Sequence, residues 1–317
     1  MKKLLINKKH LLTPELSDRV FKLITASAAL VILALMVGFF IQLLWYSMPA
    51  ISKFGFKFLI SVEWDPVKNI FGAMPSIVGT LITTIIAVTI AVPISFIAAM
   101  FLVETAPVWL KVPVSYALDL LAAIPSIIFG LWGLFIFVPF MQDHIQPFLV
   151  HNLYLKSIPI FGTVYNGFGL LTAGLILALM ILPFICAVMR DVFKMVPAVL
   201  KESAFGVGAT SWEVSLGITM KYGARGMLGA VFLGLGRAVG ETMAVLFIIG
   251  NSQILPTSLF SGGTTIAATL ANNFAEADGI FMSALFELGL ILLIISFCIQ
   301  IVGQLWLNSV SKKMGER

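Results

Sequence analysis

Long runs of apolar residues alternate with short polar segments along the whole chain. Each run is long enough to cross the hydrocarbon core of a membrane, which takes about 20 helical residues. Single polar residues inside the runs do not set up the alternation of a half-buried strand. The pattern therefore predicts an all-α membrane protein. Its six transmembrane helices are expected at residues 23–46, 74–103, 114–141, 169–189, 227–249 and 284–307.

The Lys and Arg residues between these runs predict how the chain is oriented. With the N-terminus inside, fifteen of them fall in inner segments and four in outer segments. Cytoplasmic segments carry such an excess of basic residues. We therefore expect both termini in the cytoplasm, with residues 1–22 and 308–317 flanking a single transmembrane domain at 23–307. The first run lacks a cleavage site and is longer than the core of a signal peptide, so we expect it to be retained.

Composition supports a membrane protein and argues against other classes. The chain is 60% hydrophobic and 11% charged, whereas a soluble domain is about 25% charged. The net charge of +5 does not indicate nucleic acid, because the basic residues are spread between apolar runs. Cys186 and Cys298 lie inside apolar runs, and His144 and His151 lack ligand spacing, so neither a disulfide nor a metal site is expected.

Arg237 and Glu241 place two charges inside the fifth run. Arg237 is expected roughly 15 Å into the membrane, where a charge costs from a few to more than ten kcal/mol. Residues four apart share a face of a helix, so the two side chains are expected to neutralise each other in part. A structural ion pair and an anion-binding pair both remain open. Asp119 and Glu287 lie near the ends of other runs, where we expect contact with water or headgroups.

The inner segment at about 190–225 has more internal order than a passive connector requires. Pro197 is suited to the first turn of a helix through residue 204, which Gly206 and Gly208 then interrupt. Thr210 and Glu213 have the spacing of a capping box and predict the start of a second helix. The segment is therefore predicted to present a helix, a glycine hinge and a helix to the cytosol.

Several motifs give this chain a family resemblance. Glu202-Ser203-Ala204, followed by Gly208 and Ile218, is similar to the EAA loop of binding-protein-dependent ABC importers, which docks onto an ATP-binding subunit. Gly236-Arg237-Ala238, continued by Gly240-Glu241-Thr242-Met243-Ala244-Val245, resembles the PstC family of phosphate permease subunits. Further motifs similar to that family are Phe71-Gly72-Ala73, Gly79-Thr80-Leu81, Ile124-Pro125-Ser126, Gly130-Leu131-Trp132-Gly133, Arg190-Asp191-Val192-Phe193 and Ala271-Asn272-Asn273-Phe274-Ala275-Glu276-Ala277.

The resemblance implies a fold and a set of partners. It implies a MetI-like type I importer permease in the bacterial inner membrane, working with a PstA-like permease subunit and surrounded by lipid. Two ATP-binding subunits would hold ATP and magnesium, and an extracytoplasmic binding protein would deliver inorganic phosphate. The implied docking residues are Glu202, Ser203, Ala204, Phe205 and Gly208. Because the chain has no phosphate-binding P-loop motif, we expect it to hold no cofactor and to be no enzyme.

Four residues are the candidates for the substrate pathway. Arg237 offers a permanently charged fork of donors that suits phosphate, and Glu241 would compete with the anion. Thr242 and Ser126 could add hydrogen bonds, although hydroxyls in spans often bond to their own helix. Two alternatives remain: a PstA-like or other oxyanion permease, and an ion-coupled secondary anion carrier. The predicted docking loop argues against the carrier, which has no ATPase to engage.

Overall fold

The chain folds into a bundle of long helices. The computed structural model describes residues 14–151 and 166–313. Residues 1–13 of the predicted N-terminal segment and residues 314–317 of the predicted C-terminal segment lie outside the described residues. Within the described ranges, extended pairing is limited to one isolated bridge between Asp65 and Ile70. The long helices are α1 (Pro14–Phe54), α3 (Met74–Met100), α4 (Val108–Ala123), α8 (Leu170–Lys194), α11 (Met220–Val239) and α14 (Gly279–Lys313).

Shorter helices connect and cap the long ones. The first of them, α2, lies between α1 and α3. A second group continues the chain after α3 and between α4 and α8, and the others lie in the connections around α11. They are α2 (Lys57–Ile60), η1 (Phe101–Thr105), α5 (Ser126–Trp132), η2 (Gly133–Phe137), α6 (Val138–Phe140), η3 (Met141–Ile145), α7 (Gln146–His151), α9 (Ala198–Gly206), α10 (Ser211–Val214), η6 (Ser215–Thr219), α12 (Met243–Leu246) and α13 (Ile266–Asn273), where η marks a π-helical turn.

Helix α8 forms the centre of the bundle between α3 and α11. Gly174 of α8 lies directly against Ile86 of α3, and Gly234 of α11 lies against Ile185 of α8. Small residues allow helix backbones to approach closely when lipid supplies no hydrophobic driving force. The Ser95 hydroxyl of α3 adds a hydrogen bond of 2.9 Å to the Leu182 carbonyl oxygen. These contacts give the pathway helices a closely packed support.

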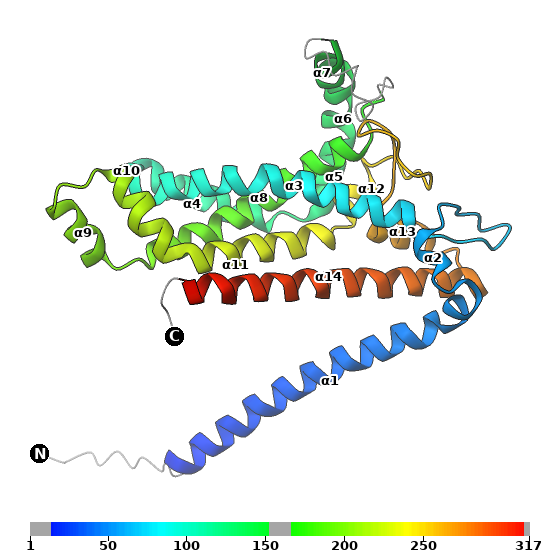
Figure 1. Cartoon of the computed structure of the whole chain (residues 1–317), viewed down its shortest axis with the longest axis horizontal. Coiled ribbons are helices and arrows are strands. Elements are labelled where there is room, and N and C mark those ends of the chain that lie inside the picture. The colour runs from blue at the N-terminus through cyan, green and yellow to red at the C-terminus, as the bar shows by residue number, and fades with distance from the viewer. Residues whose placement is uncertain (1–13, 152–165, 314–317) are drawn as a thin grey trace, which may run out of the picture.

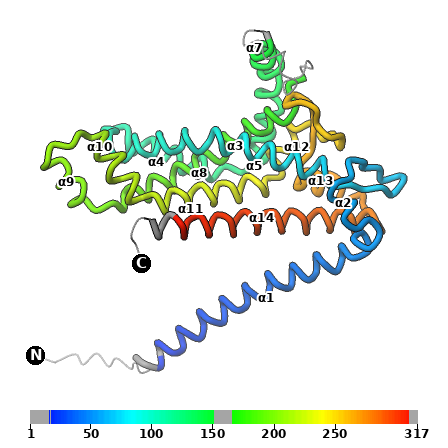
Figure 2. The backbone as a smooth tube through the Cα atoms, viewed as in Figure 1, coloured from blue at the N-terminus to red at the C-terminus, as the bar shows by residue number. Residues whose placement is uncertain are grey.

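Helix α1 meets the rest of the chain mainly through its last part. Figures 1 and 2 show its first half diverging from the bundle, and only α14 runs beside it. The Ser283 hydroxyl of α14 inserts into α1 directly after Pro49: it accepts from the Ala50 N–H at 3.0 Å and donates to the Tyr46 carbonyl oxygen at 2.7 Å. The hydroxyl thus bridges two backbone groups that lie four residues apart in α1.

Within residues 14–151 and 166–313, five segments have the length and apolar composition to cross a membrane. Four of them correspond to predicted spans, with longer helices than the sequence runs suggested. The segments are Asp18–Phe54, Met74–Thr105, Ser126–Val150, Leu170–Lys194 and Gly279–Ser309. The fifth predicted span, 227–249, is not among them. Its first part belongs to α11, which lies along α8 and α14 (Figure 1).

The predicted continuous span at 114–141 is wrong, because the helix breaks at Ile124 and Pro125. Both residues are extended, with ψ angles of 131° and 137°. Proline disfavours helical geometry in the residue before it, so α4 ends at this point. Pro125 then starts α5, and helical turns continue from there to His151. The membrane-length segment therefore begins at Ser126 rather than at residue 114.

The ends of the bundle agree with the predicted grouping of segments. Figure 1 shows α9, α10, the start of α1 and the end of α14 at one end, with α2 and α13 at the other. Such a grouping is expected if both termini share a side of the membrane with residues 190–225. The segment between α12 and α14 contains the helix α13, whose N-cap Thr265 accepts a hydrogen bond from the Ala268 N–H.

Candidate functional site: a broken helix and the helix, hinge and helix before it

Arg237 lies in the last turn of α11, just before the helix breaks. Gly240 follows the last helical residue, and the short helix α12 begins only at Met243. A cation in the last turn is stabilised by the partial negative charge of the helix C-terminus. The guanidinium carbon lies 5.5 Å from the centre of the Phe184 ring of α8, a cation–π contact. Phe184 is ten residues before the end of α8, so Arg237 lies about 15 Å from that end.

The predicted pairing of Arg237 with Glu241 is wrong. Because α11 ends at Val239, the two residues do not share a helical face. The Glu241 carboxylate instead accepts a hydrogen bond of 3.2 Å from the Ala244 N–H at the start of α12. In the part of the chain that the structure describes, Arg237 makes no ion pair. Its charge is therefore balanced by a helix end and an aromatic face rather than by a carboxylate.

Thr242 and Ser126 lie at the starts of two short helices, α12 and α5, that pack against each other. Helix α12 packs on α5 at Gly130, where an added Cβ would meet the Met243 carbonyl oxygen at 2.9 Å. Ser126 starts α5 and Thr242 precedes α12, but no hydrogen bond joins their side chains. Thr242 also lines a hollow of about 420 Å³ with residues of α13 and α14. The structure thus brings the elements of three pathway candidates together around the break after α11.

The segment at about 190–225 has the predicted helix, hinge and helix. Pro197 is the N-cap of α9, and Gly208 adopts a φ of +93°, a conformation that favours glycine. Thr210 and Glu213 form the predicted capping box. The second helix is longer than expected, because α10, η6 and α11 follow one another without a break from Ser211 to Val239. The second helix of the segment predicted to dock is therefore continuous with the helix that carries Arg237.

The predicted docking residues do not all face outward. Glu202 and Ser203 are exposed, and Phe205 retains 47% of its accessible surface. Ala204 is half-buried and lies on the same face of α9 as Lys201, which turns toward the bundle. Exposed apolar side chains extend the outer surface at Val199 and Trp212, exposed by 69% and 70%. The outer surface suits a protein partner, while Ala204 supports the inner face.

The capping box predicts a local dependence on pH. The Thr210 N–H and hydroxyl both donate to Glu213 Oε2 at 2.8 Å, and the backbone bond contributes most to lowering the pKa of Glu213 below its usual value. Because the pKa of Glu213 is lower in the folded chain than in the unfolded chain, its carboxylate stabilises the cap fully at pH values above the unfolded-state pKa of about 4.3. This stabilisation is lost as the pH falls through the folded-state pKa. We expect hydrogen-exchange protection at residues 213–215 to fall below about pH 4. Glu213→Gln is the control, and an identical acid response in that variant would contradict the assignment.

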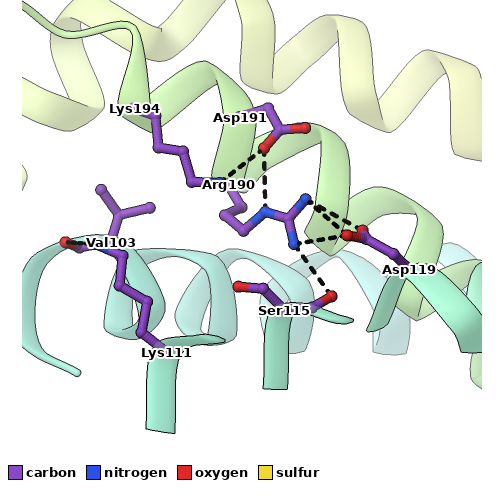
Figure 3. Close-up of polar contacts among 7 residues, drawn as sticks. All are labelled: Val103, Lys111, Ser115, Asp119, Arg190, Asp191 and Lys194. Carbon is purple, nitrogen blue, oxygen red and sulfur yellow. Dashed lines mark hydrogen bonds and ion pairs between the residues drawn. The ribbon is translucent and has the colours of Figure 1, made fainter. Parts of the chain in front are cut away.

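Arg190 forms an ion-pair cluster with Asp119 and Asp191 that the sequence did not reveal (Figure 3). Its Nη2 lies 3.1 Å from Asp119 Oδ1, its Nε donates to Asp191 at 3.1 Å, and its Nη1 donates to the Ser115 carbonyl oxygen. The Arg190 side chain is only 6% exposed, whereas that of Asp119 is 48% exposed. Asp119 is therefore half-exposed, and its ion pair with Arg190 joins α4 to α8. The available signal was two opposite charges at matching ends of adjacent apolar runs.

Glu287 departs from its expected contact with water. It lies in the third turn of α14 and is 6% exposed. Its Oε2 atom has no hydrogen-bond partner within the described residues. An ionisable side chain inside a membrane segment is costly unless it is paired or neutral. The sequence could not show this burial, because it depends on which face of α14 meets the bundle.

Comparisons with known proteins agree with this architecture. No model of a protein family matches the chain. A phosphate transport system permease protein PstC of Haemophilus influenzae is 52% identical over 303 residues, covering 94% of this chain and 96% of the relative. The PstC protein of Pasteurella multocida is 50% identical over 304 residues, covering 95% and 94%.

A solved structure shows the same fold at much lower sequence identity. A chain of the inward-facing MetNI methionine ABC transporter aligns with a TM-score of 0.57 and 18% identity, covering 74% of this chain and 94% of that one. The likeness supports the MetI-type permease fold alone. The near full-length identity to the curated relatives decides the family. The chain belongs to the PstC family of phosphate transport system permease proteins.

Proposed function

We propose that this chain is a membrane subunit of an ATP-driven importer of inorganic phosphate. The observation that carries the proposal is the position of Arg237 at the end of a helix that is continuous with the cytoplasmic docking segment. Discontinuous helices inside a membrane bundle expose backbone and polar groups at transporter substrate sites. A guanidinium without a carboxylate partner is available to a phosphate oxyanion. Motion of α10 would reach Arg237 through one helical segment.

The remaining parts of the importer follow from the same reading. A PstA-like subunit would complete the pathway around the hollow beside Thr242, and an extracytoplasmic binding protein would deliver phosphate. Two ATP-binding subunits would engage the exposed side chains of Glu202, Ser203 and Phe205. ATP and magnesium would be held by those subunits, so this chain would carry no catalytic site. The expected location is the bacterial cytoplasmic membrane, with lipid around the five apolar helical segments.

Reconstitution of the complete importer tests this function. In proteoliposomes with the binding protein and ATP, we expect phosphate to stimulate ATP hydrolysis and to accumulate, while sulfate does neither. ATP-independent uptake driven by an ion gradient would support a secondary carrier instead. Stimulation by another oxyanion alone would reassign the substrate. A cysteine at Ser203 should crosslink to the ATP-binding subunit, and a cysteine at the distant Phe56, 89% exposed at the other end of the bundle, is the control.

A further inference from the structure

Glu104 joins three segments at the cytoplasmic end of the bundle. It lies in the π-helical turn η1 at the end of α3. Its Oε1 atom is 2.6 Å from Lys201 Nζ of α9 and accepts a hydrogen bond of 2.7 Å from the Thr219 hydroxyl of η6. The Glu104 and Lys201 side chains are only 10% and 17% exposed. One carboxylate oxygen therefore connects a membrane helix, the docking helix and the base of α11.

Helix α9 has little else to hold it in place. Figure 2 shows it standing beyond the ends of the long helices, attached to the chain by a loop at either end. None of its residues is fully buried, and only Lys201 and Ala204 are not classed as exposed. In the described ranges, the bond from Lys201 to Glu104 is the single side-chain hydrogen bond between α9 and another element. Packing alone does not fix the orientation of this helix.

We propose that Glu104 is a positioning residue that holds the docking helix in register with both α3 and α11. The proposal rests on the proposed function, because it concerns how movement of an ATP-binding partner reaches the membrane helices. A charge-assisted hydrogen bond is short and directional, so it fixes where α9 sits more sharply than an apolar contact. Because the pair is largely removed from water, mobile ions screen it little.

The two bonds give Glu104 separate mechanical roles. The ion pair with Lys201 transmits movement of α9 to η1 and so to α3. The bond from Thr219 makes the same carboxylate follow η6, which continues directly into α11. A push on α9 therefore moves α3 and α11 together rather than bending the glycine hinge at Gly208. Without Glu104, the hinge would absorb part of the movement, and ATP hydrolysis would be less tightly coupled to transport.

The test measures coupling in the complete importer reconstituted in proteoliposomes. For Lys201→Met we expect the number of phosphate ions transported per ATP hydrolysed to fall about tenfold, within the usual range of coupling between sites. The same ratio should fall less in Glu104→Gln, because the amide oxygen of glutamine still accepts both hydrogen bonds. The exchange of Glu104→Lys with Lys201→Glu should restore the ratio, since the ammonium can donate to the Thr219 hydroxyl. Lys221→Met, an exposed lysine two residues after Thr219, is the matched control.

Crosslinking from a cysteine at Ser203 separates this proposal from the function on which it rests. We expect Lys201→Met to retain the crosslink while its ratio of phosphate transported per ATP hydrolysed falls. The exchange of Glu104→Lys with Lys201→Glu should restore that ratio. A retained crosslink with an unchanged ratio in both Lys201→Met and Glu104→Gln would overturn the positioning role and leave the importer intact. If the wild-type complex gives no crosslink and no phosphate-stimulated hydrolysis, both proposals fail. Normalising to assembled complex removes any effect on folding.

Discussion

Replacing Arg237 with Gln should lower phosphate uptake by about 100-fold or more, because the loss of a charge from a partly buried anion contact costs several kcal/mol. Glutamine retains two donors but has neither the charge nor the planar fork of the guanidinium. It also loses the cation–π contact with Phe184, a smaller effect at about 0.5–2 kcal/mol. Uptake of labelled phosphate by cells or proteoliposomes measures the change, normalised to the amount of assembled complex.

Two further variants separate an anion contact from a structural role. Arg237→Lys should retain part of the uptake, because charge persists while the bidentate geometry is lost. Glu241→Gln should affect uptake much less, since Glu241 caps the start of α12 and does not pair with Arg237. Normal uptake by Arg237→Gln at native assembly would remove Arg237 from the pathway. Equal losses in Arg237→Lys and Arg237→Gln would favour a geometric requirement over charge.

Gly79→Ala should have the largest effect on folding. Gly79 of α3 lies so close to the chain at Thr264 that an added Cβ would collide with the Thr264 carbonyl oxygen. This close approach lets the Thr80 hydroxyl accept from the Ile266 N–H at 2.9 Å and places the Ser76 and Thr269 hydroxyls 3.0 Å apart. Relieving the collision would pull these buried bonds apart, at a cost of about 1–3 kcal/mol or more.

Thermal unfolding of the purified chain in detergent measures the effect of Gly79→Ala. We expect a midpoint several degrees lower and a smaller yield of assembled complex. Gly229→Ala is the matched control: Gly229 also lies within a long helix, and nothing occupies the 4 Å around its added Cβ. Alanine should leave that variant unchanged or slightly stabilised through its higher helix propensity. An unchanged midpoint for Gly79→Ala would show that the turn at Thr264 can move away freely.

The sequence predicted the features that depend on local pattern. Apolar run length located α1, α3, α8 and α14, because spanning a membrane imposes a minimum length on any helix. Cap chemistry located the start of α10, since Thr210 and Glu213 satisfy each other's backbone groups within four residues. Pro197 and Gly208 marked the docking segment for similar local reasons. These features need no knowledge of the tertiary fold.

The sequence did not predict where helices end inside apolar runs, or which side chains far apart along the chain form ion pairs. Hydropathy averages over a window, so it cannot report that Pro125 or Gly240 ends a helix inside an apolar run. The Arg237 and Glu241 spacing suggested a pair only because a continuous helix was assumed. Arg190 with Asp119, and Glu104 with Lys201, are separated by 71 and 97 residues along the chain. Their pairing follows from how α3, α4, α8 and α9 pack.

The contact between α1 and α14 can form only late in the synthesis of the chain. Tyr46 and Ser283, which hydrogen-bond in the folded chain, are 237 residues apart. At a synthesis rate of about 5–20 residues per second, the Ser283 hydroxyl follows Tyr46 by roughly 10–50 seconds. During that interval α1 sits in the bilayer without the helix that later packs beside it. The apolar residues of α1 face outward on nearly every side, so lipid can cover them during that interval, and α14 completes the pair only after Ser283 has been synthesised.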